Sequence, residues 1–168
     1  MTPITAYLFA AMTSWSPLSA HAYAEAPAVT EARYARIAEE VAATVADEAP
    51  LFAGNDGRAK TALYVLAIAS YESGGFRADV LSCQTRGDGG RSYGLYQSSD
   101  RMACESVHAA TVIALRQVRQ SWTVCHDAPQ EARLGAYTAG NCEAGARSSA
   151  TRVRRAQRYW TVHPFTAE

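Results

Sequence analysis

The chain has 168 residues, of which 48% are hydrophobic and 19% are charged. This length suits one domain with its own core, and this composition excludes a disordered chain. The formal net charge is +0, so the molecule as a whole has no field that attracts nucleic acid. We therefore expect a globular monomer that does not bind nucleic acid.

The first 24 residues have features of a secretory signal peptide. Residues 4–12 read ITAYLFAAM, an apolar run too short to span a bilayer. Small residues ending at Ala22 or Ala24 offer cleavage sites, although no Lys or Arg precedes the run. We expect residues 1–24 to direct export to the periplasm or the cell exterior. Residues 25–168 would then form the mature domain, with no stable membrane insertion once the signal is removed.

The mature chain begins with two predicted helices. Thr30 is expected to cap the first, which ends at Pro50. The second, residues 59–73, is apolar on almost every side, which is typical of a helix buried in the middle of a domain. Gly74-Gly75 ends it, because glycine readily adopts the left-handed conformation that closes a helix.

The remaining chain is predicted to be helical after one irregular element. Residues 80–99 contain the turn signal Asp88-Gly89-Gly90 with short mixed flanks, which indicates a small hairpin or loop. Residues 108–122 and 129–140 are each expected to form a helix. A last amphipathic helix would begin with Ser148 or Ser149 as its cap. The predicted fold class is mainly α (α+β), with helices around a buried central helix and one small β-hairpin or loop element.

Four cysteines bear on export and on cross-linking. They are Cys83, Cys104, Cys125 and Cys142. An even number in an exported chain indicates two disulfides. Three pairings are possible from the sequence, and we expect the sequence-local one, Cys83–Cys104 and Cys125–Cys142. No C-x-x-C pair occurs, so we predict neither a zinc site nor another metal site.

Glu72 is the main candidate for catalysis. It lies at the end of the predicted buried helix, just before Gly74-Gly75. Burial and the negative end of the helix dipole both disfavour the charged carboxylate and raise its pKa. A carboxylic acid that stays protonated near neutral pH can give a proton to a leaving oxygen, as glycoside cleavage requires. The competing interpretation is an ordinary surface glutamate at a helix end.

Three short segments of the chain form a recognisable set. They are ASYESGGFRADVLS, RSYGLYQ and LGAYTAG, at residues 69–82, 91–97 and 134–140. Together they resemble the soluble lytic transglycosylase and goose-type lysozyme group of the lysozyme-like superfamily. Each element is weak alone, and their order and spacing carry the resemblance, which covers about residues 59–145. The chain departs from the family pattern with an extra glycine before Phe76, with Tyr96 for Met and with Thr138 for Asn.

The resemblance implies a lysozyme-like fold and a peptidoglycan lytic transglycosylase without a cofactor. Such an enzyme cleaves the β-1,4 bond between N-acetylmuramic acid and N-acetylglucosamine in glycan strands and leaves a 1,6-anhydro product. Glu72 would be the single acid and base. The substrate-binding candidates are Ser82, Tyr93, Gln97 and Tyr137, with the Tyr137 hydroxyl expected to point toward Glu72 or the sugar.

Two alternatives remain open from the sequence. The first is a hydrolysing muramidase in which Asp88, on the predicted loop, is the second carboxylate; an ordinary Asp-Gly-Gly turn is the stronger interpretation of Asp88. The second is a non-catalytic, disulfide-stapled wall-binding module. For Gln97 the competing interpretation is a loop anchor, and the basic run from Arg152 to Arg158 is interpreted as a solvated helix face.

Overall fold

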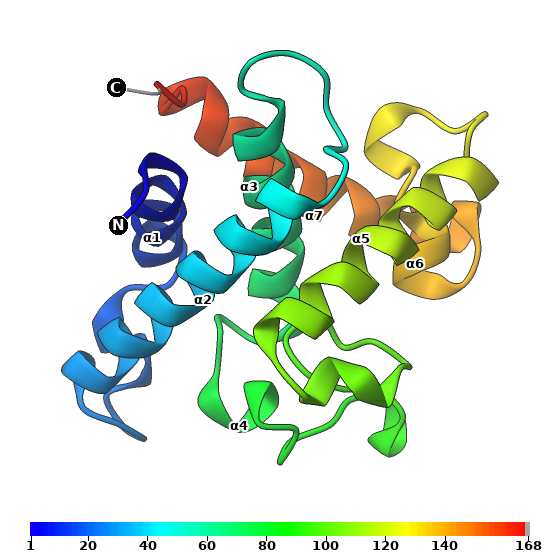
Figure 1. Cartoon of the computed structure of the whole chain (residues 1–168). Coiled ribbons are helices and arrows are strands. Elements are labelled where there is room, and N and C mark those ends of the chain that lie inside the picture. The colour runs from blue at the N-terminus through cyan, green and yellow to red at the C-terminus, as the bar shows by residue number, and fades with distance from the viewer. Residues whose placement is uncertain (167–168) are drawn as a thin grey trace.

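The computed structural model describes residues 1–166 and is mainly helical over that range (Figure 1). Its α-helices are α1 (Pro3–Trp15), α2 (Pro27–Asp47), α3 (Gly57–Glu72), α4 (Ala78–Leu81), α5 (Val107–Val124), α6 (Gly135–Ala139) and α7 (Cys142–Val162). Short 3-10 turns lie at Leu18–His21, Asp88–Gly90, Arg101–Cys104 and Gln130–Ala132. The prediction of a mainly α fold is therefore confirmed.

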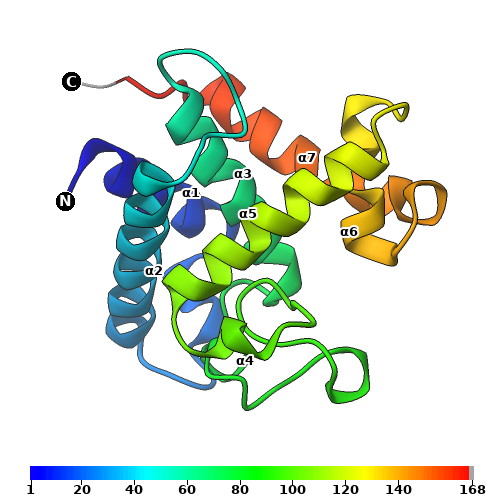
Figure 2. The ribbon, with the colours of Figure 1, turned by 45° about the vertical axis from the view of Figure 1, so that its right-hand side comes forward.

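Helix α3 is the centre of the domain. It contacts α1, α2, α5 and α7, which surround it in Figures 1 and 2. Every residue from 61 to 70 is buried, as expected for a helix without a polar face. The predicted buried central helix is confirmed, and it extends to Glu72 as its last residue.

The turn after α3 is held from several directions. Gly74 and Gly75 have φ of 59° and 80°, which glycine adopts without strain. The carbonyl oxygen of Gly75 accepts a hydrogen bond from the Tyr34 hydroxyl at 3.1 Å. It also lies 2.8 Å from Nε2 of His21 and accepts from the Ser16 hydroxyl at 3.4 Å. The end of α3 is thus fixed to α2 and to the segment that precedes α2.

Helix α1 lies within the segment predicted to be a signal peptide. Its Leu8, Ala11 and Met12 side chains are fully buried and belong to the same core as those of α2 and α3. The Trp15 ring contacts the ring of Tyr159 edge to face at 5.6 Å. The structure packs this segment as part of the domain, and its removal on export stays a prediction.

The predicted helix caps were wrong for α2 and α7. Helix α2 begins at Pro27, whose fixed φ suits the first turn, and the Thr30 hydroxyl donates to Glu25 instead. Helix α7 begins at Cys142, and the side chain of Asn141 accepts a hydrogen bond from the backbone of the first turn. Ser149 lies about two turns inside α7, where it is buried.

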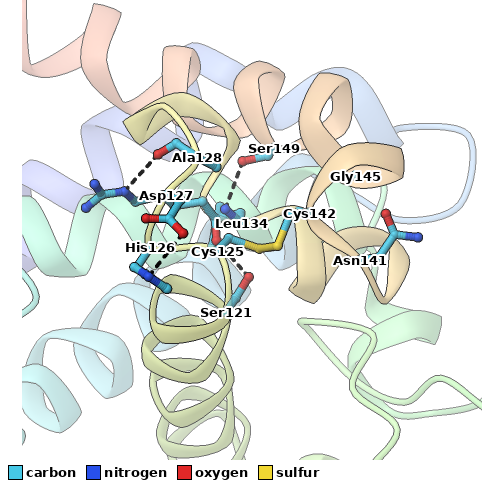
Figure 3. The surroundings of a disulfide bond; sticks show 12 residues. Ser121, Cys125, His126, Asp127, Ala128, Leu134, Asn141, Cys142, Gly145 and Ser149 are labelled. Atoms are coloured by element: carbon cyan, nitrogen blue, oxygen red, sulfur yellow. Dashed lines mark hydrogen bonds and ion pairs between the residues drawn. A yellow bond between two sulfur atoms is a disulfide. The ribbon is translucent and has the colours of Figure 1, made fainter.

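The predicted helix over residues 129–140 is broken into a 3-10 turn and the short α6. Side chains from other helices satisfy backbone donors here. The amide of Leu134 donates to the Ser149 hydroxyl at 3.0 Å, and that of Tyr137 donates to the Ser121 hydroxyl at 3.0 Å. Figure 3 shows Ser149 of α7 reaching the chain at Leu134. Tertiary contacts therefore replace the continuous helix that the local pattern favours.

The segment between α4 and α5 is a loop with two isolated antiparallel bridges, Gly87 with Ser92 and Tyr93 with Ser98. This agrees with the expected small hairpin or loop. The structure also confirms the sequence-local disulfides, Cys83–Cys104 and Cys125–Cys142. The first closes the loop, and the second joins the end of α5 to the start of α7 (Figure 3). Over residues 1–166, none of the helices has the length and apolar character of a membrane span.

Candidate active site

A groove of about 470 Å³ opens beside the end of α3. Its walls come from α3, from the loop before α5, from the second half of α5 and from α6. Glu72 is the residue that α3 contributes. The other lining residues are Asp88, Ser92, Tyr96, Gln97, Ser98, Ser99, Gln117, Gln120, Ser121, Val124, Ala136, Tyr137, Thr138 and Gly140. Two carboxylates in a wall of amides and hydroxyls are therefore the chemical character of this groove.

The Glu72 carboxylate forms an ion pair with Arg152 of α7. Both nitrogens contact the same oxygen, Oε1: Nε of Arg152 donates at 2.8 Å, and Nη2 lies at 2.6 Å. The Arg152 and Glu72 side chains are only 16% and 18% exposed. No hydrogen bond within residues 1–166 reaches Oε2 of Glu72. Oε2 is consequently the oxygen available to carry a proton or to contact a ligand.

Two opposing effects set the pKa of Glu72. Burial raises the pKa of the Glu72 carboxyl, the Arg152 guanidinium and its hydrogen bond lower it, and the negative charge of Asp88 raises it. The result is a pKa above the usual range of a glutamate. Burial is the largest effect, as the sequence predicted, whereas the arginine that opposes it was not foreseen.

Asp88 lies on the same groove as Glu72. Its side chain belongs to an exposed residue at the first position of a 3-10 turn, and its φ of 49° is unusual for a residue other than glycine. Oδ2 of Asp88 accepts a hydrogen bond from the Ser92 hydroxyl, which fixes the carboxylate to the loop. The structure therefore brings the two candidate carboxylates to one groove. Asp88 is also a residue of the turn.

Gln97 and Tyr137 also line this groove, where they hold its walls together. The amide nitrogen of the Gln97 side chain donates to the Gly94 carbonyl at 3.0 Å, which is the arrangement of a loop anchor. The Tyr137 hydroxyl donates to the carbonyl oxygen of Tyr96 at 2.9 Å, so it joins α6 to the loop. Burial and then the charge of Glu72 raise the pKa of the Tyr137 hydroxyl. This hydroxyl donates to a backbone acceptor of the neighbouring wall rather than to Glu72, and its contact with a sugar stays a prediction.

Ser82 and Tyr93 lie outside the groove. Ser82 follows α4 and lines a separate cavity of about 320 Å³. The Tyr93 ring is 7% exposed and lies under the guanidinium groups of Arg86 and Arg101, which are 5.2 Å and 5.8 Å from the ring centre. The structure gives this ring no open face on which a sugar would stack.

Sequence reasoning missed Arg152 and the polar residues of α5 that line the groove, Gln117, Gln120 and Ser121. The run around Arg152 looked like a solvated helix face. A signal was present, however, since Arg152 directly precedes Val153 of the buried stripe of α7 and therefore borders the core. An arginine at such a border can lay its apolar stem along the core while its charged head stays at the edge.

The groove suits a ligand rich in hydroxyl and amide groups. Its neutral amides and hydroxyls both donate and accept hydrogen bonds, and its two carboxylates supply acid–base chemistry. Within residues 1–166 no three His, Cys, Asp or Glu side chains are grouped to hold a metal ion. Comparisons with protein-family models, with curated proteins and with solved structures find no match to this chain.

Proposed function

We propose that the protein is an extracytoplasmic lytic transglycosylase of lysozyme-like fold that cleaves peptidoglycan strands, with Glu72 as its single acid and base. One observation carries the proposal. A glutamate at the end of the buried helix α3 faces a groove of neutral polar side chains and has a raised pKa. The choice of peptidoglycan as the substrate rests on the resemblance of residues 59–145 to the transglycosylase group.

In the proposed reaction, Oε2 of Glu72 protonates the glycosidic oxygen as the bond between that oxygen and C1 of N-acetylmuramic acid breaks. The acetamido group of the same sugar stabilises the positive charge at C1. The C6 hydroxyl then attacks C1 and gives its proton to the Glu72 carboxylate, which regenerates the acid. No water is consumed, and the product is the 1,6-anhydro sugar.

Arg152 has a defined part in this scheme. It holds Oε1 by two donors, which fixes the carboxyl plane and leaves Oε2 for the proton. It also stabilises the carboxylate that forms once the proton has left, because the opposite charge favours the ionised form. Arg152 is a positioning residue for Glu72.

Export is the part of the proposal that the disulfides support. Two disulfides within a chain of this size are typical of proteins that fold in an oxidising compartment. The first encloses the loop with Asp88 and Gln97, and the second encloses α6 with Tyr137. Both walls of the groove would therefore be cross-linked in the periplasm or outside the cell.

Glu72→Gln tests the catalytic assignment. The amide cannot donate a proton as an acid does, so clearance of purified cell walls should fall about 100- to 10,000-fold, the usual contribution of general acid–base catalysis. Glu39→Gln is the matched control, because Glu39 is exposed on α2, and it should leave activity unchanged. Equal, measurable wall clearance by wild type and Glu72→Gln would remove Glu72 from the mechanism, whereas wall binding without clearance by the wild type would favour a non-catalytic wall-binding module.

A hydrolysing muramidase is the second candidate, and the position of Asp88 on the same groove favours it. In that enzyme, the second carboxylate activates water or stabilises the sugar cation. Mass spectrometry of the released fragments separates the two reactions. The transglycosylase gives anhydro ends, and Asp88→Asn changes its rate by less than about tenfold; reducing ends that disappear in Asp88→Asn identify the muramidase.

A further inference from the structure

A second cavity, of about 530 Å³, lies against α7 and contains no acidic residue in its lining. Its positive charge comes from three arginines of α7, Arg154, Arg155 and Arg158. Its aromatic walls include Trp15 of α1 and Tyr71 of α3. Because Tyr71 immediately precedes Glu72, this cavity opens next to the proposed catalytic residue.

The three arginines differ in whether a carboxylate already forms an ion pair with them. Arg154 pairs with Glu131 at 2.8 Å. The Arg155 guanidinium stacks 4.0 Å from the centre of the Tyr71 ring and donates to the neutral Ser70 hydroxyl at 2.8 Å. Over the described part of the chain, neither Arg155 nor Arg158 has a carboxylate partner. Two guanidinium groups are therefore left uncompensated, one held in place by aromatic rings and one exposed on the rim.

The Tyr71 ring contacts both the ion pair of Glu72 and an arginine of the second cavity. Arg152, which pairs with Glu72, also lies over this ring, at 5.4 Å from its centre. Arg155 of the second cavity packs on the same ring. A ligand that extends from the groove across Tyr71 would thus meet neutral hydrogen-bonding groups first and unpaired arginines next.

We infer that this arginine and aromatic cavity binds the carboxylates of an acidic peptide attached to the glycan strand held in the groove. Planar guanidinium groups match carboxylates with two parallel hydrogen bonds, and the Trp15 and Tyr71 rings hold the Arg155 guanidinium in place for such a contact. The inference rests on the proposed function and adds the substrate class, namely strands that carry acidic peptides in preference to bare neutral glycans.

Titration of the full chain with a small peptide, followed by NMR, tests the cavity without catalysis. N-acetyl-Ala-Glu-Ala has two carboxylates and should bind at least tenfold more tightly than the uncharged N-acetyl-Ala-Gln-Ala amide. Arg158→Gln should weaken binding of the acidic peptide about tenfold. Arg147→Gln makes the same change on an exposed residue of α7, roughly 16 Å along the helix, and should alter binding less than twofold.

Three results of that titration would overturn the inference. They are equal binding of the charged and uncharged peptides, equal weakening by Arg147→Gln and Arg158→Gln, or tighter binding of poly(glycerol phosphate) than of the acidic peptide. The last result would assign the cavity to a phosphate polymer.

A second measurement uses cell-wall glycan with its peptides and the same glycan after the peptides are removed. Arg158→Gln should raise KM severalfold on the peptide-bearing strands with kcat unchanged, and should have no effect on the bare strands. If Arg158→Gln is neutral on both while the wild type cleaves them, the inference fails and the proposed function stands. If the wild type cleaves neither, the proposed function fails, and the peptide titration still decides the cavity.

Discussion

Helices α3 and α7 meet at the candidate site and differ in composition: α3 is mostly apolar, and α7 is amphipathic and basic. Helix α3 has every residue from 61 to 70 buried and ends in one carboxylate. Helix α7 buries only a stripe, which includes Val153, Ala156 and Tyr159, and exposes a basic face. The ion pair between Glu72 and Arg152 joins the two. The buried helix thus raises the pKa of Glu72 by removing water, and the amphipathic helix supplies a countercharge that limits this rise.

The largest expected difference between the helices is in stability. Leu66 of α3 is fully buried, and Leu66→Ala should lower the free energy of unfolding by about 2–5 kcal/mol, because it removes apolar contacts and leaves a cavity. Arg147→Ala on the exposed face of α7 should change it by less than about 0.5 kcal/mol. Chemical denaturation measures both. Equal losses would contradict the division into a core helix and a boundary helix.

A smaller effect is expected at the ion pair, and it depends on pH. Arg152→Met keeps a long side chain against Tyr71 but removes the charge that lowers the pKa of Glu72. The pKa of Glu72 in the folded protein should rise further above its unfolded value. Stability from such a group is present below the unfolded pKa and is lost as the pH rises through the folded pKa. Arg152→Met should therefore lose about 1–3 kcal/mol relative to wild type at pH 8 and much less at pH 4.

Denaturation curves at several pH values check this prediction. The double variant Glu72→Gln/Arg152→Met is the control, because it has no carboxyl at position 72 to titrate. Its stability should depend less on pH than that of Arg152→Met. If Arg152→Met shows the same pH dependence as wild type, the guanidinium does not set the charge state of Glu72.

The smallest expected effect compares how the two helices begin. The Asn141 side chain accepts from the amide of Ala144 at 2.8 Å at the start of α7, whereas Asp56 at the start of α3 makes no such capping bond. Asn141→Ala should cost about 1 kcal/mol. Asp56→Ala loses only the exposed pair with Lys60 and should cost less than about 0.5 kcal/mol. Thermal melts rank the two, and the reverse order would contradict the capping assignment.

The contrast between α3 and α7 also explains how much of the fold and of the candidate site could be predicted from the sequence. Helix α3, its end at Gly74-Gly75 and the position of Glu72 follow from local patterns of apolar residues and glycines, and they were predicted. Arg152 lies 80 residues from Glu72 along the chain, and no local pattern pairs two residues at that separation. The helix over residues 129–140 failed for a similar reason, since hydroxyls from α5 and α7 take its backbone donors.

Candidate residues in the loop show a further limit of local patterns. Gln97 and Tyr93 occur four residues apart in one motif, yet one lines the groove and the other is covered by two arginines. The backbone reverses between them, with bridges at Tyr93 and Ser98 and left-handed residues at Gly94 and Gln97. The motif therefore identified a loop that lines the groove, and only the turn geometry decides which of its side chains reach the groove.

The two disulfides cross-link two parts of the groove wall, the loop before α5 and the segment with α6, separately from the core. Each closes its own covalent ring, with sequence separations of 21 and 17 residues, and the two rings do not overlap in the sequence. Doubling the length of such a ring adds only about 0.6 kcal/mol of closure entropy. Either ring can therefore gain or exchange residues at little cost to α3. The shape of the groove can change ring by ring while the helix that presents Glu72 stays the same.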